Sequence, residues 1–103
     1  MKNLTQEEWK KGVTDGNNIE ILDVRTPDEF NERYIPGAKN IDIYRGQGFL
    51  DEVNELDKTK EYYVYCRSGA RSAQACALME QQGFENTNNL MGGINEWKGE
   101  VTN

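Results

Sequence analysis

Short apolar runs alternate with polar, helix-like segments along the whole chain, and this alternation restricts the possible folds more than any other feature. Strands are predicted at residues 19–24, 40–43, 62–65 and 87–90, where apolar or β-branched side chains concentrate. Helices are predicted at residues 5–14, from residue 26 onward, and at residues 49–56, 72–82 and 94–98. Strands that alternate with helices indicate an α/β protein with a mostly parallel sheet.

Two of the predicted helices begin with the signals of a capped N-terminus. Thr5 is followed by acidic residues, which suit the positive end of a helix. Thr26 is followed by Pro27, which is favoured at the first helical position, and then by two acids. Gly16 and Gly83 are expected to end the helices that precede them.

Size, charge and cysteine content narrow the classes of function. The chain has 103 residues, which predicts one domain over residues 1–103. Its net charge of −6 disfavours nucleic acid and anionic membranes as partners. No apolar run approaches the ~20 residues of a membrane span, and the first residues lack the apolar stretch of a signal peptide. Two cysteines fit a reducing compartment, so we expect a cytoplasmic protein.

The segment after the most apolar predicted strand carries the candidate chemistry. Ligands of parallel α/β sheets bind beyond the carboxyl ends of the strands, and Cys66 directly follows the run at residues 62–65. Gly69 permits a tight turn, and backbone N–H groups turned inward at the start of the next helix would stabilise a thiolate. Histidine is absent, which excludes His-ligated metals and Ser-His or Cys-His catalysis, and we expect neither a metal nor another cofactor.

A reactive thiol needs a pKa of about 3.5–7.5 instead of about 8.5. A helix N-terminus contributes only about 0.3–1 kcal/mol, whereas one pKa unit corresponds to about 1.4 kcal/mol. We therefore expect the loop N–H groups and the charges of Arg67 and Arg71 to contribute most of the shift. The alternative is that Cys66 is a buried structural residue beside two surface arginines. Cys76 is expected to pack in the core, about 15 Å along the helix from Cys66 and too far for a disulfide.

Four motifs follow one another along the chain. They are LDVRTPDEF at residues 22–30, continued by IPGAKNI at 35–41; YCRSGARS at 65–72; GF at 83–84; and LMGGINEW at 90–97. Together they resemble the rhodanese family of sulfurtransferases in its small single-domain form, over nearly all of the chain. The resemblance implies a rhodanese-like α/β fold, with a five-stranded, mostly parallel sheet flanked by helices on both faces.

The resemblance also implies an activity and a set of site residues. Cys66 would be the nucleophile, which takes a sulfur atom from an anionic donor such as thiosulfate and becomes a persulfide. The acceptor would be cyanide, a thiol or a thiol-bearing protein. Asp23, Arg25 and Glu29 are expected to be structural, with Arg25 and Glu29 paired. The donor would be bound by the loop residues Arg67, Ser68, Gly69, Ala70 and Arg71, with Arg67 and Arg71 attracting its charge.

The sequence departs from the family pattern at one pair of residues. Arg33 and Tyr34 stand where the family usually has Gly-His. We expect this difference to change the local turn and its hydrogen bonds, but not the fold or the activity.

Two other functions are compatible with some of the same residues. Cys-dependent phosphatases and arsenate reductases place five residues between Cys and Arg, but only four separate Cys66 from Arg71, which leaves little room for phosphate. A rhodanese-like domain that has lost catalysis would instead serve as a scaffold or as a sulfur carrier to a partner, but inactive members of the family typically lack the cysteine, which this chain keeps.

Overall fold

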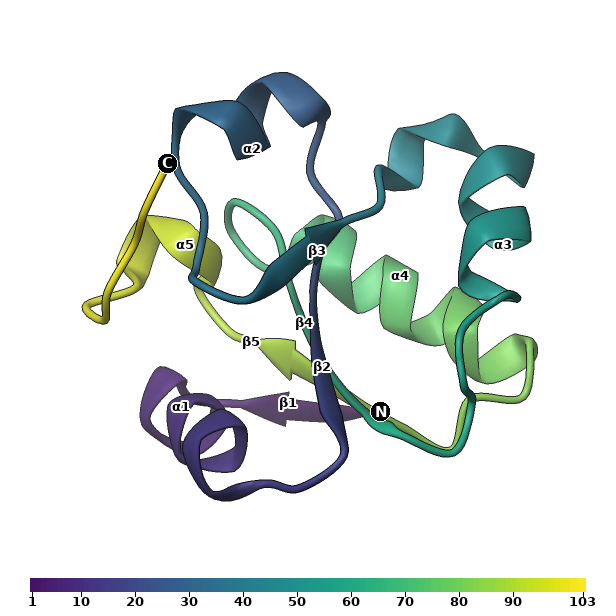
Figure 1. The fold of residues 1–103 in the computed structure, drawn as a ribbon, viewed down its shortest axis with the longest axis horizontal. Helices are drawn as coiled ribbons and strands as arrows, with labels where there is room; N and C mark the ends of the chain where they lie inside the picture. The colour runs from purple at the N-terminus through teal and green to yellow at the C-terminus, as the bar shows by residue number, and fades with distance from the viewer.

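Five parallel strands form one sheet in the structure, a computed structural model that describes residues 1–103 (Figure 1). The strands are β1 (Lys2–Leu4), β2 (Ile19–Asp23), β3 (Ala38–Asn40), β4 (Glu61–Tyr65) and β5 (Asn86–Leu90). Their order across the sheet is β1-β5-β4-β2-β3, and every neighbouring pair is parallel. The expected five-stranded α/β fold is confirmed, with the most apolar strand, β4, at its centre.

Helices cover both faces of the sheet. They are α1 (Gln6–Asp15), α2 (Pro27–Glu32), α3 (Gln47–Val53), α4 (Ala70–Gln81) and α5 (Gly93–Glu96), with a 3₁₀ turn, η1, at Ile43–Arg45. In Figure 1, α3 and α4 lie on one side of the strands and α1 and α5 on the other. The two faces correspond to two separate apolar clusters, so the sheet is buried on both sides.

The alternation of side chains along β4 divides the core between these faces. Tyr62 and Val64 belong to the cluster under α3 and α4, whereas Tyr63 and Tyr65 belong to the cluster that contains Trp9 of α1. Successive side chains of a strand point to opposite faces, which explains why a continuous apolar run is needed here. Cys66, the next residue, therefore points toward the face covered by α4.

Both predicted helix starts are confirmed. Thr5 caps α1 and Thr26 caps α2, and in each case the residue three positions later, Glu8 or Glu29, completes a capping box. Such a box satisfies two N–H groups that the helix itself leaves unpaired. The box at Thr26 also fixes the position of Glu29, which faces the candidate site.

One expectation about the strands was wrong, and one strand was not expected. The predicted strand at residues 40–43 lies earlier, at β3, because the Asp42 carboxylate accepts a hydrogen bond from the backbone N–H of Tyr44 and thereby begins η1. Strand β1 was not predicted, because Lys2 and Asn3 carry no apolar signal. It pairs with β5 and places Asn3 beside Asn89.

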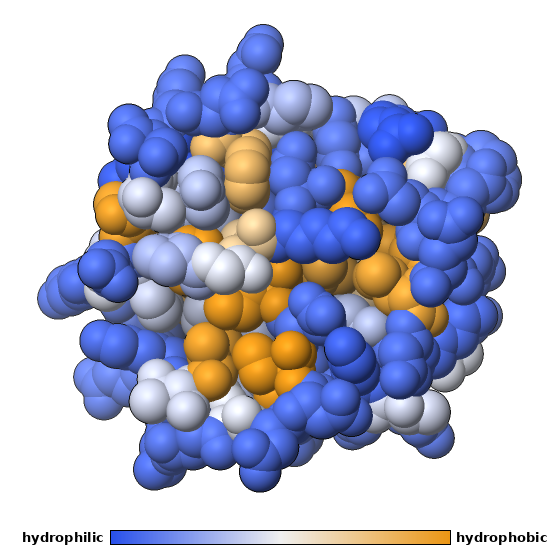
Figure 2. All heavy atoms as spheres, in the orientation of Figure 1, coloured by the Kyte–Doolittle hydropathy of each residue, from blue (hydrophilic) through white to orange (hydrophobic).

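The surface is mainly hydrophilic. Figure 2 shows polar residues over most of the face seen in Figure 1, with hydrophobic ones gathered near its centre, over the strands. None of the helices combines the length and the apolar character that crossing a lipid bilayer requires.

Candidate active site

Cys66 lies at the C-terminal end of the central strand, where the chain turns into the loop before α4. Its residue surface is only 1% exposed, because the loop of residues 67–69 folds over it. This is the edge of the sheet at which parallel α/β proteins bind ligands. The position agrees with the expectation that chemistry resides in the segment leaving β4.

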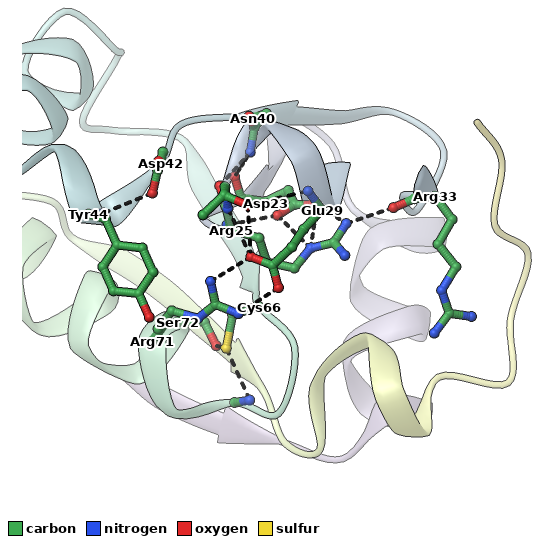
Figure 3. A network of polar contacts seen from close by, with 12 residues as sticks. Asp23, Arg25, Glu29, Arg33, Asn40, Asp42, Tyr44, Cys66, Arg71 and Ser72 are labelled. Carbon is green, nitrogen blue, oxygen red and sulfur yellow. Dashed lines mark hydrogen bonds and ion pairs between the residues drawn. The ribbon is translucent and has the colours of Figure 1, made fainter. Parts of the chain in front are cut away.

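The sulfur of Cys66 accepts hydrogen bonds from the loop and from α4 (Figure 3). The backbone N–H of Gly69 lies 3.1 Å from Sγ, and the Ser72 hydroxyl oxygen lies 3.3 Å from it. Gly69 caps α4 with a φ of 107°, a conformation that side chains other than hydrogen rarely adopt. The glycine therefore allows the loop to direct its N–H group at the sulfur.

These hydrogen bonds control the protonation of the thiol. Burial is the largest single influence and raises the pKa of Cys66, but the Ser72 hydroxyl and the backbone N–H groups of Ser72, Gly69 and Ser68 outweigh it. The net effect is a pKa below the ordinary value of a thiol. The expected contribution of the loop N–H groups is confirmed, but the expected contribution of the Arg67 and Arg71 charges is not among the main causes of the shift.

Ser72 was not among the predicted site residues, yet it lies directly behind the sulfur. Its hydroxyl is also within hydrogen-bonding distance of Asn89 Oδ1 on β5. A hydroxyl carries a single hydrogen, so Sγ and Asn89 Oδ1 compete for it. When Cys66 is a thiol, its S–H can donate to Ser72 Oγ while Ser72 donates to Asn89; when Cys66 is a thiolate, Ser72 can donate to the sulfur.

Asn89 also holds the loop in place. Its Nδ2 donates to the carbonyl oxygen of Gly69 at 3.3 Å and to Asn3 Oδ1 at 3.0 Å. Asn89 is itself 3% exposed, and both of these bonds are partly buried. The unforeseen strand β1 thus supports the loop through Asn3.

The start of α5 binds the carbonyl groups of the loop and holds them away from the sulfur. The backbone N–H groups of Ile94 and Asn95, at the start of α5, donate to the carbonyl oxygens of Cys66 and Arg67, each at 3.0 Å. Gly93 makes this approach possible, since a Cβ there would lie 2.4 Å from the oxygen of Arg67. With the carbonyls engaged on one side, the N–H groups face the sulfur.

Arg71 and Glu29 form the ion pair nearest the loop. Nη1 and Nη2 of Arg71 donate to the two carboxylate oxygens of Glu29 at 2.8 and 2.9 Å, and the guanidinium lies 5.3 Å from the Tyr44 ring centroid. The hydrogen bond from Arg71 lowers the pKa of Glu29 to about 2. This bidentate pair fixes the Arg71 side chain beside the site.

The expected pair between Arg25 and Glu29 was therefore wrong. Arg25 instead pairs with Asp23, with its Nη2 2.6 Å from Oδ2, and both side chains are almost completely buried. The Asp23 carboxylate also accepts the backbone N–H of Arg25, so a turn of two residues already brings the two groups together. Glu29 is left for Arg71, which the fold brings to it from 42 residues away.

The remaining predicted site residues lie around the mouth of the loop. Arg67, Ser68 and Ala70 are exposed, and Ala70 is the first residue of α4. Arg67 makes no ion pair, so its guanidinium is available to a ligand. No group of three or more acidic or cysteine side chains is arranged as metal ligands would be.

Cys76 differs from Cys66 in its position and in the direction of its pKa shift. It lies within α4, is fully buried in the core, and burial raises its pKa to about 12. Both cysteines are free thiols. The expected packing of Cys76 in the core is confirmed.

Comparisons with known proteins find similar proteins over nearly the whole chain. A family model described as the rhodanese-like domain matches residues 5–100. A sulfurtransferase of Allochromatium vinosum is 35% identical, in an alignment covering 91% of this chain and 85% of that protein. The putative sulfurtransferase YtwF of Bacillus subtilis is 35% identical, covering 98% of this chain and 94% of that one. The crystal structure of a rhodanese-like domain protein from Staphylococcus aureus superposes with a TM-score of 0.82, at 34% identity, over 97% of this chain and 94% of that one.

Proposed function

The chain belongs to the family of rhodanese-like sulfurtransferases, and from this membership we propose that it moves a sulfane sulfur through a persulfide on Cys66. The proposed donor is an anion such as thiosulfate, and the proposed acceptor is cyanide in an assay or a thiol, free or on a protein, in the cell. We place the reaction in the cytoplasm, where reducing conditions keep Cys66 and Cys76 as thiols.

The proposed reaction has two steps. The Cys66 thiolate attacks the outer sulfur of thiosulfate, the S–S bond of the donor breaks, and sulfite leaves with the bonding electron pair. The outer sulfur of the resulting persulfide is then attacked by cyanide or a thiolate, and Cys66 leaves as the thiolate. Covalent catalysis of this kind divides one difficult transfer into two easier ones.

The observation that carries the proposal is the set of hydrogen bonds donated to Sγ. The Gly69 N–H and the Ser72 hydroxyl favour the anionic form of the sulfur, which is the nucleophile in the first step and the leaving group in the second. Because the chain has no histidine, these hydrogen bonds take the place of a neighbouring base in activating the Cys66 thiol. Arg67, with no ion pair of its own, is the first candidate to attract the donor, whereas the charge of Arg71 is paired with Glu29, which holds this side chain beside the loop.

Intact-mass measurement after incubation with thiosulfate tests the proposal. We expect a gain of one sulfur atom that cyanide or dithiothreitol removes. Cys66→Ser should abolish the gain, and Cys76→Ser is the matched control that should retain it, because Cys76 lies in the core away from the loop. Loading that survives Cys66→Ser and is lost in a folded Cys76→Ser protein contradicts the assignment. Stable loading without turnover would instead indicate a sulfur carrier.

The phosphatase alternative is tested on the same protein. Four residues separate Cys66 from Arg71, and the loop already directs N–H groups at the sulfur itself. A phosphoryl group would bring further oxygens that need donors, and each unpaired one in a closed site costs about 1–3 kcal/mol. We therefore expect negligible hydrolysis of aryl phosphates. Inserting one glycine between Gly69 and Ala70 should lower sulfur transfer, whereas substantial aryl phosphate hydrolysis by the native chain, lost in Cys66→Ser, would refute the sulfurtransferase assignment.

A further inference from the structure

Two arginines lack an ion-pair partner, and both line the same hollow beside the thiol loop. Arg25, Arg45 and Arg71 each pair with a carboxylate, whereas Arg33 and Arg67 pair with none. The chain has 18 acidic residues against 12 basic ones, so a shortage of carboxylates does not explain the two unpaired cations. Their shared position suggests that they are kept free for an anion.

The hollow lies between the end of α2, the loop after β4 and the start of α5. Its volume is about 60 Å³, and a site that holds one water molecule needs only about 10–15 Å³ on the same measure. The space is therefore sufficient for a small polar group such as a carboxylate. The polar residues that line it are Arg25, Glu29, Glu32, Arg33, Arg67 and Asn95.

Arg25 lines this hollow with a side chain that is itself nearly buried. Its side chain is 5% exposed, and its Nε and Nη2 donate to Asp23 and to the carbonyl oxygen of Arg33. Its Nη1 donates to no protein atom. In Figure 3 one nitrogen of this guanidinium carries no dashed line and lies on the side toward the Arg33 side chain. A nearly buried guanidinium with an unused donor is an incomplete hydrogen-bonding site.

The charges in the hollow leave a positive excess. Arg25 and Glu29 are each neutralised by a partner outside the lining, which leaves Arg33 and Arg67 against Glu32 alone. Guanidinium groups present planar pairs of donors that match a carboxylate. The hollow therefore favours a small planar anion within an acidic protein.

We propose that this hollow, built by Arg25, Arg33 and Arg67, is an anion subsite that binds the carboxylate of a small thiol acceptor. The proposal rests on the proposed sulfurtransferase function and names the acceptor class. Arg67 both lines the hollow and belongs to the loop that follows Cys66, so the proposal directs the thiol of an acceptor bound there toward this loop. The acceptor thiolate attacks the outer sulfur, the bond from that sulfur to Cys66 Sγ breaks, and Cys66 leaves with the electron pair.

The test uses two thiols that differ in charge. Persulfide-loaded protein is treated with 3-mercaptopropionate or with 2-mercaptoethanol, and the return to the unmodified mass is timed for wild type, Arg33→Gln and Arg45→Gln. The ratio of variant to wild-type rate is taken for each thiol, which removes the difference in their nucleophilicity. Arg45→Gln is the matched control, since it changes the net charge equally but removes an exposed arginine that pairs with Glu52, outside the hollow.

We expect Arg33→Gln to slow 3-mercaptopropionate about tenfold, the loss of one hydrogen bond to a charged group, and to leave 2-mercaptoethanol unchanged. Arg45→Gln should leave both rates unchanged. Equal effects of Arg33→Gln on both thiols, or an equal effect of Arg45→Gln on 3-mercaptopropionate, would overturn the subsite.

A second measurement does not depend on sulfur transfer. Titration of the unloaded protein with propionate, followed by the NMR signals of the arginine Nε–Hε groups, should shift Arg25, Arg33 and Arg67 in a saturable manner. Arg33→Gln should abolish saturation at Arg25 and Arg67. Failure of thiosulfate loading refutes the proposed function, whereas the absence of saturable shifts refutes the subsite.

Discussion

Replacing Ser72 with alanine should make the Cys66 thiol less acidic and less reactive. The Ser72 hydroxyl is one of the hydrogen-bond donors that lower the pKa of Cys66, and its oxygen lies 3.3 Å from Sγ. A hydrogen bond to a charged group contributes about 1.5–3 kcal/mol. The hydroxyl is shared with Asn89 Oδ1, so the lower end of this range applies. About 1.4 kcal/mol is a tenfold change in an equilibrium constant, so at a pH below the midpoint of titration the thiolate fraction should fall about tenfold.

Alkylation by iodoacetamide as a function of pH measures this change. The pKa of Cys76 is raised to about 12 by burial, so Cys76 adds no background near neutral pH. In Ser72→Ala the midpoint of the alkylation profile should move to higher pH, and the rate below that midpoint should fall about tenfold. The persulfide should load more slowly in proportion.

Ser68→Ala is the matched control. Ser68 contributes only its backbone N–H to the sulfur, and its side chain is exposed, so this substitution should leave the alkylation profile where it is. An unchanged midpoint in folded Ser72→Ala, or an equal displacement in Ser68→Ala, would refute the conclusion that the Ser72 hydroxyl donates to the thiolate.

Three further changes test the support of the site. The pKa of Glu29 is about 2, against an ordinary 4.5, so its pairing with Arg71 stabilises the fold above pH ~4.5, and this stabilisation is lost as the pH falls toward 2. The unfolding free energies of wild type and Glu29→Gln, measured by urea denaturation, should therefore converge as the pH falls through this window. Tyr65→Phe removes the hydroxyl that accepts the buried N–H of Ile35 at 3.0 Å, and the unfolding free energy should fall by about 1–3 kcal/mol; a loss within error would show that the N–H finds another partner. Gly93→Ala places a Cβ 2.4 Å from a loop carbonyl oxygen, at a φ of 59°, so both the melting temperature and persulfide loading should fall, and normal loading would contradict the role assigned to α5.

The features that could be predicted from the sequence are those determined by residues close together along the chain. The apolar run at residues 62–65 predicted the central strand, and the threonine caps predicted where α1 and α2 begin. The end of that strand in turn predicted the position of Cys66. Periodicity and capping are local signals, so one sequence is enough to interpret them.

The features that were missed depend on contacts between distant segments. The pairing of Glu29 with Arg71, and not with Arg25, is decided by the arrival of α4 beside α2. The contact of Ser72 with the sulfur spans only six residues, but its second partner, Asn89, is set beside Val64 by the register of β5. One signal was present in the sequence: a serine one residue after Arg71, facing the same side of the helix start as the loop.

The contacts of α5 with the thiol loop have a consequence for the newly made chain. Residues 93–95 close the loop by binding the carbonyl oxygens of Cys66 and Arg67, yet they are synthesised almost thirty positions after Cys66. A ribosome adds roughly 5–20 residues per second, so for more than a second Cys66 exists without the template that directs N–H groups at it. During that interval the carbonyl oxygens of Cys66 and Arg67 lack the partners that hold them in the folded protein. The complete thiol loop therefore forms only once α5 has been made and has packed against it.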